Sequence, residues 1–143
     1  MADRPDLAAM TVRLGRALVA IEAPILDKYE ISMWGYIVLT ALRRAPLRGQ
    51  SVLAEAIGAD KTRLIAVLDE LQQRRLIRRD PDPADRRARI LALTKQGERL
   101  QARVQQAIRR EETRLLEDVR PRERETFLRV LQELTRRTCE SDA

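Results

Sequence analysis

The sequence predicts a mainly α-helical chain with one small β-hairpin. The first observation is a pair of helical segments, residues 50–57 and 61–74, separated by a tight turn that contains Gly58. The second is an alternation of apolar and polar residues in segments 76–79 and 88–93, which flank a charged stretch rich in turn-forming residues. The third is helical spacing of apolar residues in four further segments, which makes six expected helices in all.

The paired segments around Gly58 predict a helix-turn-helix. Asp60 can cap the second helix by accepting hydrogen bonds from backbone N–H groups of its first turn. Leu64, Leu68 and Leu71 recur on one face of that helix, which indicates that this face is buried. In a helix-turn-helix the second helix enters the major groove of DNA. The hairpin that follows directly makes the predicted fold a winged helix-turn-helix.

The four remaining helices are expected at residues 7–27, 33–44, 95–118 and 121–138. Ser32 and Thr94 are suitable N-caps for the second and third of these helices. Pro24 should kink or restart the first helix, because proline cannot donate a hydrogen bond to the preceding turn. A first helix of this length needs a partner over its apolar face, and the same helix in a second copy is the favoured partner.

Composition limits the classes of function. The chain has 143 residues, of which 44% are hydrophobic and 35% charged, which suits one domain with a real core. Its formal net charge of +6 favours a polyanionic partner. The sequence contains no histidine, which removes the commonest general base and the commonest zinc ligand. We therefore expect no enzymatic activity, no metal site and no cofactor.

The location of the protein is also constrained by the sequence. No stretch approaches the roughly 18 apolar residues of a membrane span, and residues 1–6 lack the order of a signal peptide. The single cysteine, Cys139, excludes an internal disulfide framework and is expected to be an exposed, unused thiol. These features predict a cytoplasmic protein without a membrane partner, associated with the nucleoid when bound to DNA.

The start of the second helix of the helix-turn-helix holds the first group of candidate DNA contacts. These residues are Lys61, Thr62, Arg63 and Ile65. Arg63 could bond guanine O6 and N7 bidentately, which contributes roughly 1–3 kcal/mol of discrimination. Thr62 could contact a phosphate near the free N–H groups of the helix N-terminus. The alternative is an ordinary solvated helix start.

The hairpin tip holds the second group, Arg86, Arg87 and Arg89. Residues 61–89 contain nine Lys or Arg and five Asp or Glu, so most of the net charge of the chain falls there. A basic hairpin beside a helix-turn-helix can place arginine in a narrow minor groove. Asp85 is close enough in sequence to orient Arg87 by an ion pair. The alternative is a surface turn with paired charges.

The hairpin sequence resembles the wing signature of the MarR family of bacterial transcription regulators. The matching segments are Asp82-Pro-Ala-Asp-Arg-Arg87 and Leu93-Thr-Lys-Gln-Gly97, with Leu53-Ala-Glu, Ile57-Gly-Ala-Asp60, Leu68-Asp-Glu-Leu71 and Leu76-Ile-Arg-Arg79 in register upstream. The resemblance implies a single domain over residues 1–143 and a homodimer. It implies that helices within 5–30 and 118–138 form the dimerisation region, that residues 33–97 form the winged lobe, and that residues 95–118 form a long connecting helix.

The resemblance also implies roles for residues. Arg87 corresponds to the minor-groove arginine of the wing, Asp85 to its supporting acid, and residues 61–63 to the major-groove readers. Three positions depart from the family pattern. Ile65 and Ala66 replace threonine and arginine, and Gly49 adds a residue before the first helix of the motif. Arg75 replaces the glycine that usually ends the second helix, so we expect that helix to end differently.

The family commonly releases DNA on binding a small aromatic or phenolic, often anionic, effector between its dimerisation helices and its lobe. The residues at the corresponding junction are Tyr29, Met33, Trp34, Tyr36 and Arg43. An apolar crevice with few polar groups would suit such a ligand. The alternative is that these side chains only fill the core and cover the surface.

The sequence therefore predicts a homodimeric, sequence-specific regulator that binds a pseudo-palindromic double-stranded DNA operator as a repressor. The alternative is a winged-helix module that binds another protein and has no specific affinity for DNA.

Overall fold

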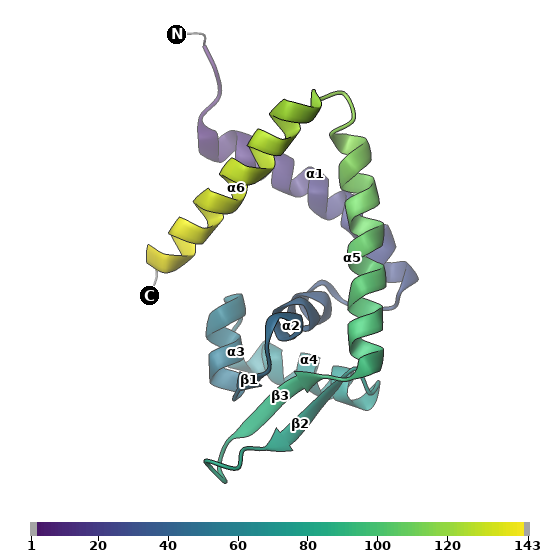
Figure 1. Cartoon of the computed structure of the whole chain (residues 1–143), viewed down its shortest axis with the longest axis vertical. Coiled ribbons are helices and arrows are strands. Elements are labelled where there is room, and N and C mark those ends of the chain that lie inside the picture. The colour runs from purple at the N-terminus through teal and green to yellow at the C-terminus, as the bar shows by residue number, and fades with distance from the viewer. Residues whose placement is uncertain (1–2, 142–143) are drawn as a thin grey trace. The chain divides into compact units, whose positions relative to one another are not determined.

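The computed structural model describes residues 3–141, which form six helices and a three-stranded antiparallel sheet (Figure 1). The helices are α1 (Leu7–Lys28), α2 (Met33–Arg44), α3 (Gln50–Ile57), α4 (Lys61–Gln73), α5 (Lys95–Leu115) and α6 (Pro121–Ser141). The strands are β1 (Leu47–Arg48), β2 (Ile77–Pro81) and β3 (Arg89–Leu93). The chain divides into two compact units, residues 1–108 and 109–143. The predicted fold class, mainly α with a small winged hairpin, is confirmed.

Two local features differ in part from the predictions. The sheet has three strands rather than two, because β1 pairs with β3 through Leu47 opposite Leu91 and Arg48 opposite Ile90. A strand of two residues is too short to show the alternation from which strands are predicted. Helix α1 continues through Pro24, so the helix does not restart there, and a kink at this proline stays a prediction. Pro24 lies on an exposed side of α1, where the missing backbone hydrogen bond leaves no group buried without a partner.

The core of the first unit is formed by leucines and valines from α2 to α5 and the sheet. The fully buried side chains include Leu39 of α2, Leu53 of α3, Leu64 and Leu68 of α4, Leu91 of β3 and Val104 of α5. The predicted buried face of α4 is confirmed, since Leu64, Leu68 and Leu71 are all at most 2% exposed. These contacts fix α4 against the sheet.

Helix α4 ends in the left-handed conformation that glycine usually provides, although the residue there is Arg75. Its φ is +58°. The Arg75 N–H donates to the Gln72 carbonyl (2.9 Å) and the Leu76 N–H to the Leu71 carbonyl (2.9 Å), the two hydrogen bonds of a Schellman motif. The expectation that this helix ends differently is therefore wrong. The hydrogen bonds and the burial of Leu76 outweigh the cost of about 1–2 kcal/mol for a non-glycine residue in this region.

Helix α5 begins against the end of α4. The Thr94 hydroxyl accepts a hydrogen bond from the Gly97 N–H (3.0 Å), which confirms the predicted N-cap, and donates to the Arg75 carbonyl (2.7 Å). The Thr94 N–H also donates to the Leu76 carbonyl (3.1 Å). A Cβ at Gly97 would lie 2.0 Å from that same carbonyl oxygen, so only glycine fits. We call Arg75, Leu76, Thr94 and Gly97 the α4–α5 joint.

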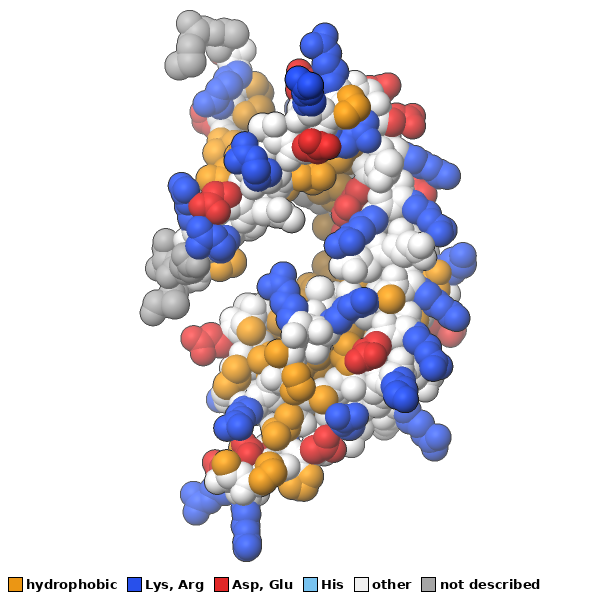
Figure 2. All heavy atoms as spheres, in the orientation of Figure 1, with side chains coloured by type: hydrophobic (Ala, Val, Ile, Leu, Met, Phe, Trp, Pro, Cys, Tyr) orange, Lys and Arg blue, Asp and Glu red, His pale blue; other side chains and the backbone are white. Residues whose placement is uncertain are grey.

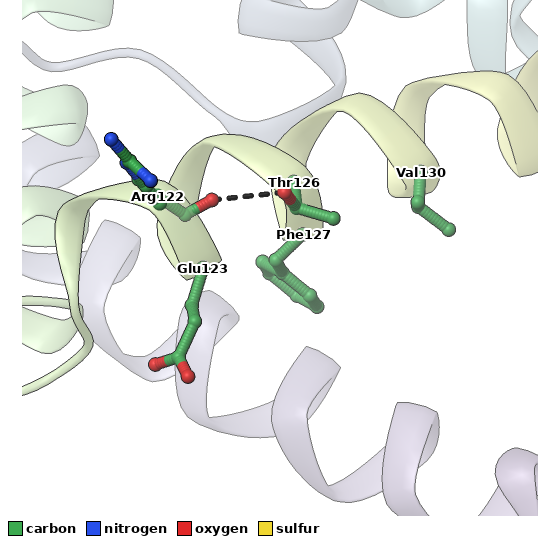
Figure 3. Close-up of a pocket in the computed structure, with 5 residues that line it drawn as sticks. All are labelled: Arg122, Glu123, Thr126, Phe127 and Val130. Atoms are coloured by element: carbon green, nitrogen blue, oxygen red, sulfur yellow. Dashed lines mark hydrogen bonds between the residues drawn. The ribbon is translucent and has the colours of Figure 1, made fainter.

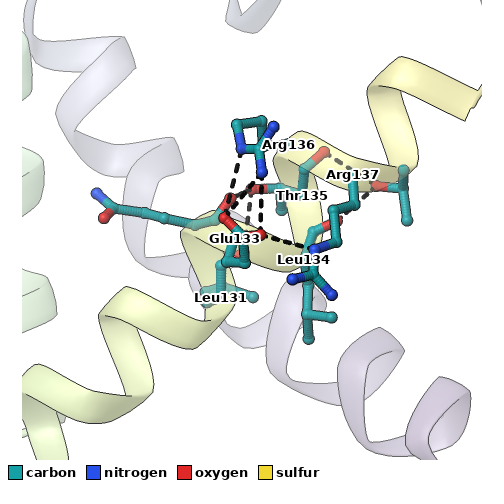
Figure 4. Close-up of polar contacts among 8 residues, drawn as sticks. Leu131, Glu133, Leu134, Thr135, Arg136 and Arg137 are labelled. Carbon is teal, nitrogen blue, oxygen red and sulfur yellow. Dashed lines mark hydrogen bonds and ion pairs between the residues drawn. The ribbon is translucent and has the colours of Figure 1, made fainter.

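The second unit consists of the end of α5 and helix α6. Glu133 of α6 accepts hydrogen bonds from Arg136 (2.9 Å) and Arg137 (2.6 Å), and these polar contacts follow one side of the helix (Figure 4). No side chain of α6 is buried among residues 121–139. Within residues 3–141, no helix is both long enough and apolar enough to cross a lipid bilayer.

Replacing Arg75 with glycine should stabilise the protein. Because Arg75 has a positive φ, Arg75→Gly should raise the free energy of unfolding by about 1 kcal/mol. Gln72→Gly is the matched control, since Gln72 lies inside α4, where glycine should cost about 1 kcal/mol. Urea titration monitored by circular dichroism measures both changes. A loss of stability in Arg75→Gly would show that the arginine side chain itself holds the end of the helix.

Candidate nucleic-acid interface

The turn between α3 and α4 is built by two residues. Gly58 ends α3 with a φ of +68°, a conformation that glycine adopts without strain. The Asp60 carboxylate then accepts a hydrogen bond from the Arg63 N–H (2.8 Å), which confirms the predicted N-cap of α4. The first turn of α4 therefore begins at Lys61 and keeps its remaining free N–H groups at the surface.

The first turn of α4 is exposed, while the face behind it is buried. Lys61, Thr62 and Arg63 are all exposed, and Leu64 is 1% exposed. Ile65 is 47% exposed, although it is apolar. The four predicted residues thus form part of the exposed surface at the start of α4. Such a surface, with two cations at a positive helix N-terminus, can bind an anionic polymer.

Arg63 has a partner that the sequence analysis did not assign. Its guanidinium carbon lies 5.6 Å from the centre of the Trp34 ring, which belongs to α2. Trp34 and Arg63, together with the apolar side chains of Val38, Ile57 and Val67, line a crevice with no room for a ligand. A cation over the face of tryptophan is attracted by the ring quadrupole. Trp34 therefore restricts the rotamers of Arg63 without neutralising its charge.

The hairpin tip is a hydrogen-bonded turn that centres on Asp82, which is 5% exposed. The Asp82 carboxylate accepts a hydrogen bond from the Ala84 N–H (2.9 Å), and it lies 3.9 Å from the Arg48 guanidinium. The Asp82 N–H donates to the Ala88 carbonyl (3.2 Å), which closes the loop at its base. These contacts give residues 82–88 a defined conformation.

The predicted ion pair between Asp85 and Arg87 is not found. Instead the Asp85 carboxylate accepts a hydrogen bond from the Arg87 backbone N–H (3.0 Å), and no ion pair joins the two side chains in the described structure. An Asx turn of this kind lets the short aspartate side chain bond to the backbone two residues on. Asp85 therefore orients the backbone at Arg87, and the guanidinium extends freely.

The arginines of the hairpin fall into two groups. Arg78 pairs with Asp80 (2.8 Å) and Arg79 pairs with Asp69 of α4 (2.8 Å), so the strands carry paired charges. The group at the tip is different. Within residues 3–141, no hydrogen bond or ion pair engages the guanidinium groups of Arg86, Arg87 and Arg89. Figure 2 shows basic side chains at the free end of the hairpin.

The predicted ligand-pocket residues lie in different local environments. Trp34 packs against Arg63 of α4, and Met33 is 38% exposed. Tyr29 and Tyr36 pack against the buried core. Arg43 donates a hydrogen bond to Gln101, a fully buried residue of α5. A binding role for this set stays a prediction.

The sequence analysis missed the role of three residues that support this surface. Trp34 packs against Arg63, and Arg48 lies beside the buried carboxylate of Asp82. Arg48 lies in the two-residue strand β1, which has no periodicity to reveal it. Asp82 could have been assigned from its place before Pro83, because Asp-Pro favours the start of a turn. Trp34 had no sequence signal, since it lies 29 residues from Arg63.

Comparison with known proteins agrees with the fold and the hairpin sequence. The model of the MarR family matches residues 33–88. A candidate transcriptional regulatory protein for the hcr operon of Thauera aromatica is 32% identical over 108 residues. The aligned segment covers 76% of this chain and 65% of the relative, so the chain spans slightly less than two thirds of that protein.

Solved structures resemble the chain over nearly its whole length. Wild-type MarR from E. coli in its apo form has a TM-score of 0.80 at 19% identity, and the match covers 92% of this chain and 98% of that one. The transcriptional repressor CouR, solved bound to a 23-mer DNA duplex, has a TM-score of 0.78 at 27% identity. That match covers 91% of this chain and 92% of CouR.

A double-mutant cycle should detect the contact between Trp34 and Arg63. We expect a coupling energy of about 0.5–1 kcal/mol in the free energy of unfolding between Trp34→Leu and Arg63→Gln, because the pair is exposed on one side. Chemical denaturation of the four proteins measures it. A cycle with Lys61→Gln in place of Arg63→Gln is the control and should show no coupling. Strictly additive effects for Trp34 and Arg63 would rule out an energetic role for the contact.

Proposed function

We propose that the chain is a member of the MarR family of winged helix-turn-helix transcription regulators, whose family model matches residues 33–88, and that it binds double-stranded DNA as a homodimeric repressor of a pseudo-palindromic operator. The observation that carries this proposal is the free positive charge of the hairpin tip. Arg86, Arg87 and Arg89 are exposed and without partners in the described structure, while Arg78 and Arg79 are paired with carboxylates. Unpaired arginines on a rigid turn suit a polyanion.

In this proposal α4 enters the major groove by its first turn. Arg63, which lies beside Trp34, donates two hydrogen bonds to a guanine edge. Thr62 and Lys61 contact the phosphate backbone near the helix N-terminus. Ile65, exposed on the same turn, packs on a thymine methyl group. These roles divide the surface into residues that position the helix and residues that read bases.

The hairpin tip reaches the neighbouring minor groove. Arg87 inserts there, and Arg86 and Arg89 contact the flanking phosphates. Asp85 contributes by holding the backbone of Arg87, as its hydrogen bond to the Arg87 N–H supports (3.0 Å). The CouR protein, 27% identical, is a repressor that has been solved on a DNA duplex, which supports repression as the mode of regulation.

The apolar faces of α1 and α6 support a homodimer. Leu7, Met10 and Leu14 of α1 follow helical spacing and are 38–63% exposed. Phe127 and Val130 of α6 lie along one apolar pocket, where Thr126 bonds back to the Arg122 carbonyl (2.9 Å) (Figure 3). A helix with so much exposed apolar surface requires a covering partner.

The organisation that follows from this dimer has three parts. Helices within residues 5–30 and 118–138 form the dimerisation region, residues 33–97 form the DNA-binding lobe, and residues 95–118 connect the two. A two-fold axis between the copies would present two α4 helices to half-sites about one helical turn apart, roughly 34–36 Å. The operator is therefore expected to be pseudo-palindromic. Release by a small aromatic or phenolic effector at the junction of Tyr29, Met33, Trp34, Tyr36 and Arg43 is part of the same proposal.

Removing Arg87 should weaken DNA binding without affecting assembly. Arg87→Ala should lower affinity for a selected operator by about tenfold or more, equivalent to about 1.4 kcal/mol. Fluorescence anisotropy with a labelled duplex at two salt concentrations measures the affinity and its salt dependence. Arg110→Ala removes the same charge from an exposed position of α5 and should change the affinity little. Equal losses of DNA affinity in Arg87→Ala and Arg110→Ala would show that the wing contributes only its positive charge and not a specific contact.

A charge on the apolar face of α6 should separate the copies. Leu131→Glu places a carboxylate among Phe127, Leu128 and Leu134, all 41–45% exposed in the single chain. We expect the variant to sediment as a monomer, because burying an unpaired charge at an interface costs several kcal/mol. Gln132→Glu, on an exposed side of the same helix, is the control and should remain dimeric. A wild-type monomer at micromolar concentration would contradict the proposed assembly.

A further inference from the structure

A basic pocket lies beside the α4–α5 joint, within the first compact unit. Its volume is about 300 Å³. The lining residues are Arg74, Leu76, Gln96, Arg99, Leu100 and Arg103. Three of these six residues are arginines and none is acidic. None of the six is among the proposed DNA contacts or the predicted effector-pocket residues, so neither proposed role accounts for this pocket.

Arg74 is held in place by the end of α1. Its guanidinium donates to the carbonyls of Glu30 and Tyr29, the second at 3.4 Å. These carbonyls follow the last turn of α1, where Glu30 adopts a left-handed φ of +53° and the helix provides no further donors. A guanidinium has five N–H donors, so these two contacts leave others available. Arg74 is therefore a cation with restricted motion at the edge of the pocket.

Arg99 and Arg103 have no comparable partners. Both are exposed on α5, and no hydrogen bond or ion pair engages either guanidinium within the described residues 3–141. They are four residues apart on one helix face, where like charges repel and destabilise the helix. Figure 2 shows basic side chains along this helix. A bound anion would relieve this repulsion.

The rest of the pocket is apolar or neutral. Leu76 and Leu100 also line the pocket. Leu76 is 2% exposed and Leu100 is half-buried, so the accessible hydrocarbon comes mainly from Leu100. Gln96 adds an amide that can donate or accept a hydrogen bond. A contact made only to a DNA backbone would need exposed cations but no hollow with apolar walls. The combination indicates a small molecule with one strongly anionic group and an apolar part.

We propose that this pocket binds a small phosphate monoester with an apolar substituent. A phosphate dianion presents several oxygens, and guanidinium forks match it in geometry and charge. Arg74 would supply the fixed contact, Arg99 and Arg103 would close on the other oxygens, and the substituent would lie against Leu76 and Leu100. Because Arg74 also binds the end of α1, the occupied pocket would link α1, α4 and α5.

Isothermal titration calorimetry with the 143-residue chain at constant ionic strength tests the site. The probes are phenyl phosphate, inorganic phosphate, which lacks the apolar part, and benzoate, which carries one charge. We expect phenyl phosphate to bind at least about tenfold more tightly than either of the others. The double variant R99Q/R103Q should lose at least about tenfold in affinity for it, and R109Q/R110Q, which removes two exposed arginines further along α5, should bind it normally.

Each result has a defined meaning. Equal binding of inorganic phosphate would overturn the apolar part of the proposal, and equal binding of benzoate would overturn the preference for a dianion. Equal weakening in both double variants, or no binding of phenyl phosphate, would overturn the site. R99Q/R103Q should also bind operator DNA as the wild type does. A clear loss of DNA affinity in that variant, with phenyl phosphate binding retained, would assign these arginines to the DNA backbone instead.

Discussion

The close approach of Gly97 to the Leu76 carbonyl is the constraint on which the rest of the first unit depends. At this point the first turn of α5 lies against the backbone between α4 and β2, leaving no space for a side chain. The Thr94 hydroxyl joins both sides, since it caps α5 through the Gly97 N–H and bonds to the Arg75 carbonyl. The end of α4, the base of the hairpin and the start of α5 therefore behave as one rigid connection.

This connection supports the two exposed basic surfaces, which are the hairpin tip and the first turn of α4. The hairpin is fixed at its base by the α4–α5 joint and along its length by the ion pair of Arg79 with Asp69 of α4. Its tip is fixed by the buried Asp82. The guanidinium groups at the tip, by contrast, have no hydrogen-bond or ion-pair partner within the described residues. A backbone frame held by these contacts loses little entropy on binding, which favours a specific complex.

Much of the fold could be predicted from local sequence, whereas several contacts could not. The buried stripe of α4, the Asp60 and Thr94 caps and the hairpin each have a signal within a few residues. The left-handed Arg75 could not be predicted from propensity, because the surrounding Schellman hydrogen bonds override the preference for glycine. The contacts of Trp34 with Arg63 and of Arg74 with Glu30 join residues 29 and 44 positions apart, and no local pattern encodes them. The spacing of Asp85 and Arg87 predicts a contact between them, but it does not show which group of Arg87 is bound. The Asp85 carboxylate binds the backbone N–H and not the guanidinium.

The stability of Gly97→Ala tests the central claim most directly. The added Cβ would lie 2.0 Å from the Leu76 oxygen, so the joint must open, and the free energy of unfolding should fall by at least about 3 kcal/mol. Gly15→Ala is the matched control, since a Cβ there meets nothing within 4 Å and alanine suits the interior of α1. A destabilised Gly97→Ala beside an unchanged or stabilised Gly15→Ala is the predicted result. Equal stability of Gly97→Ala and the wild type would contradict the account.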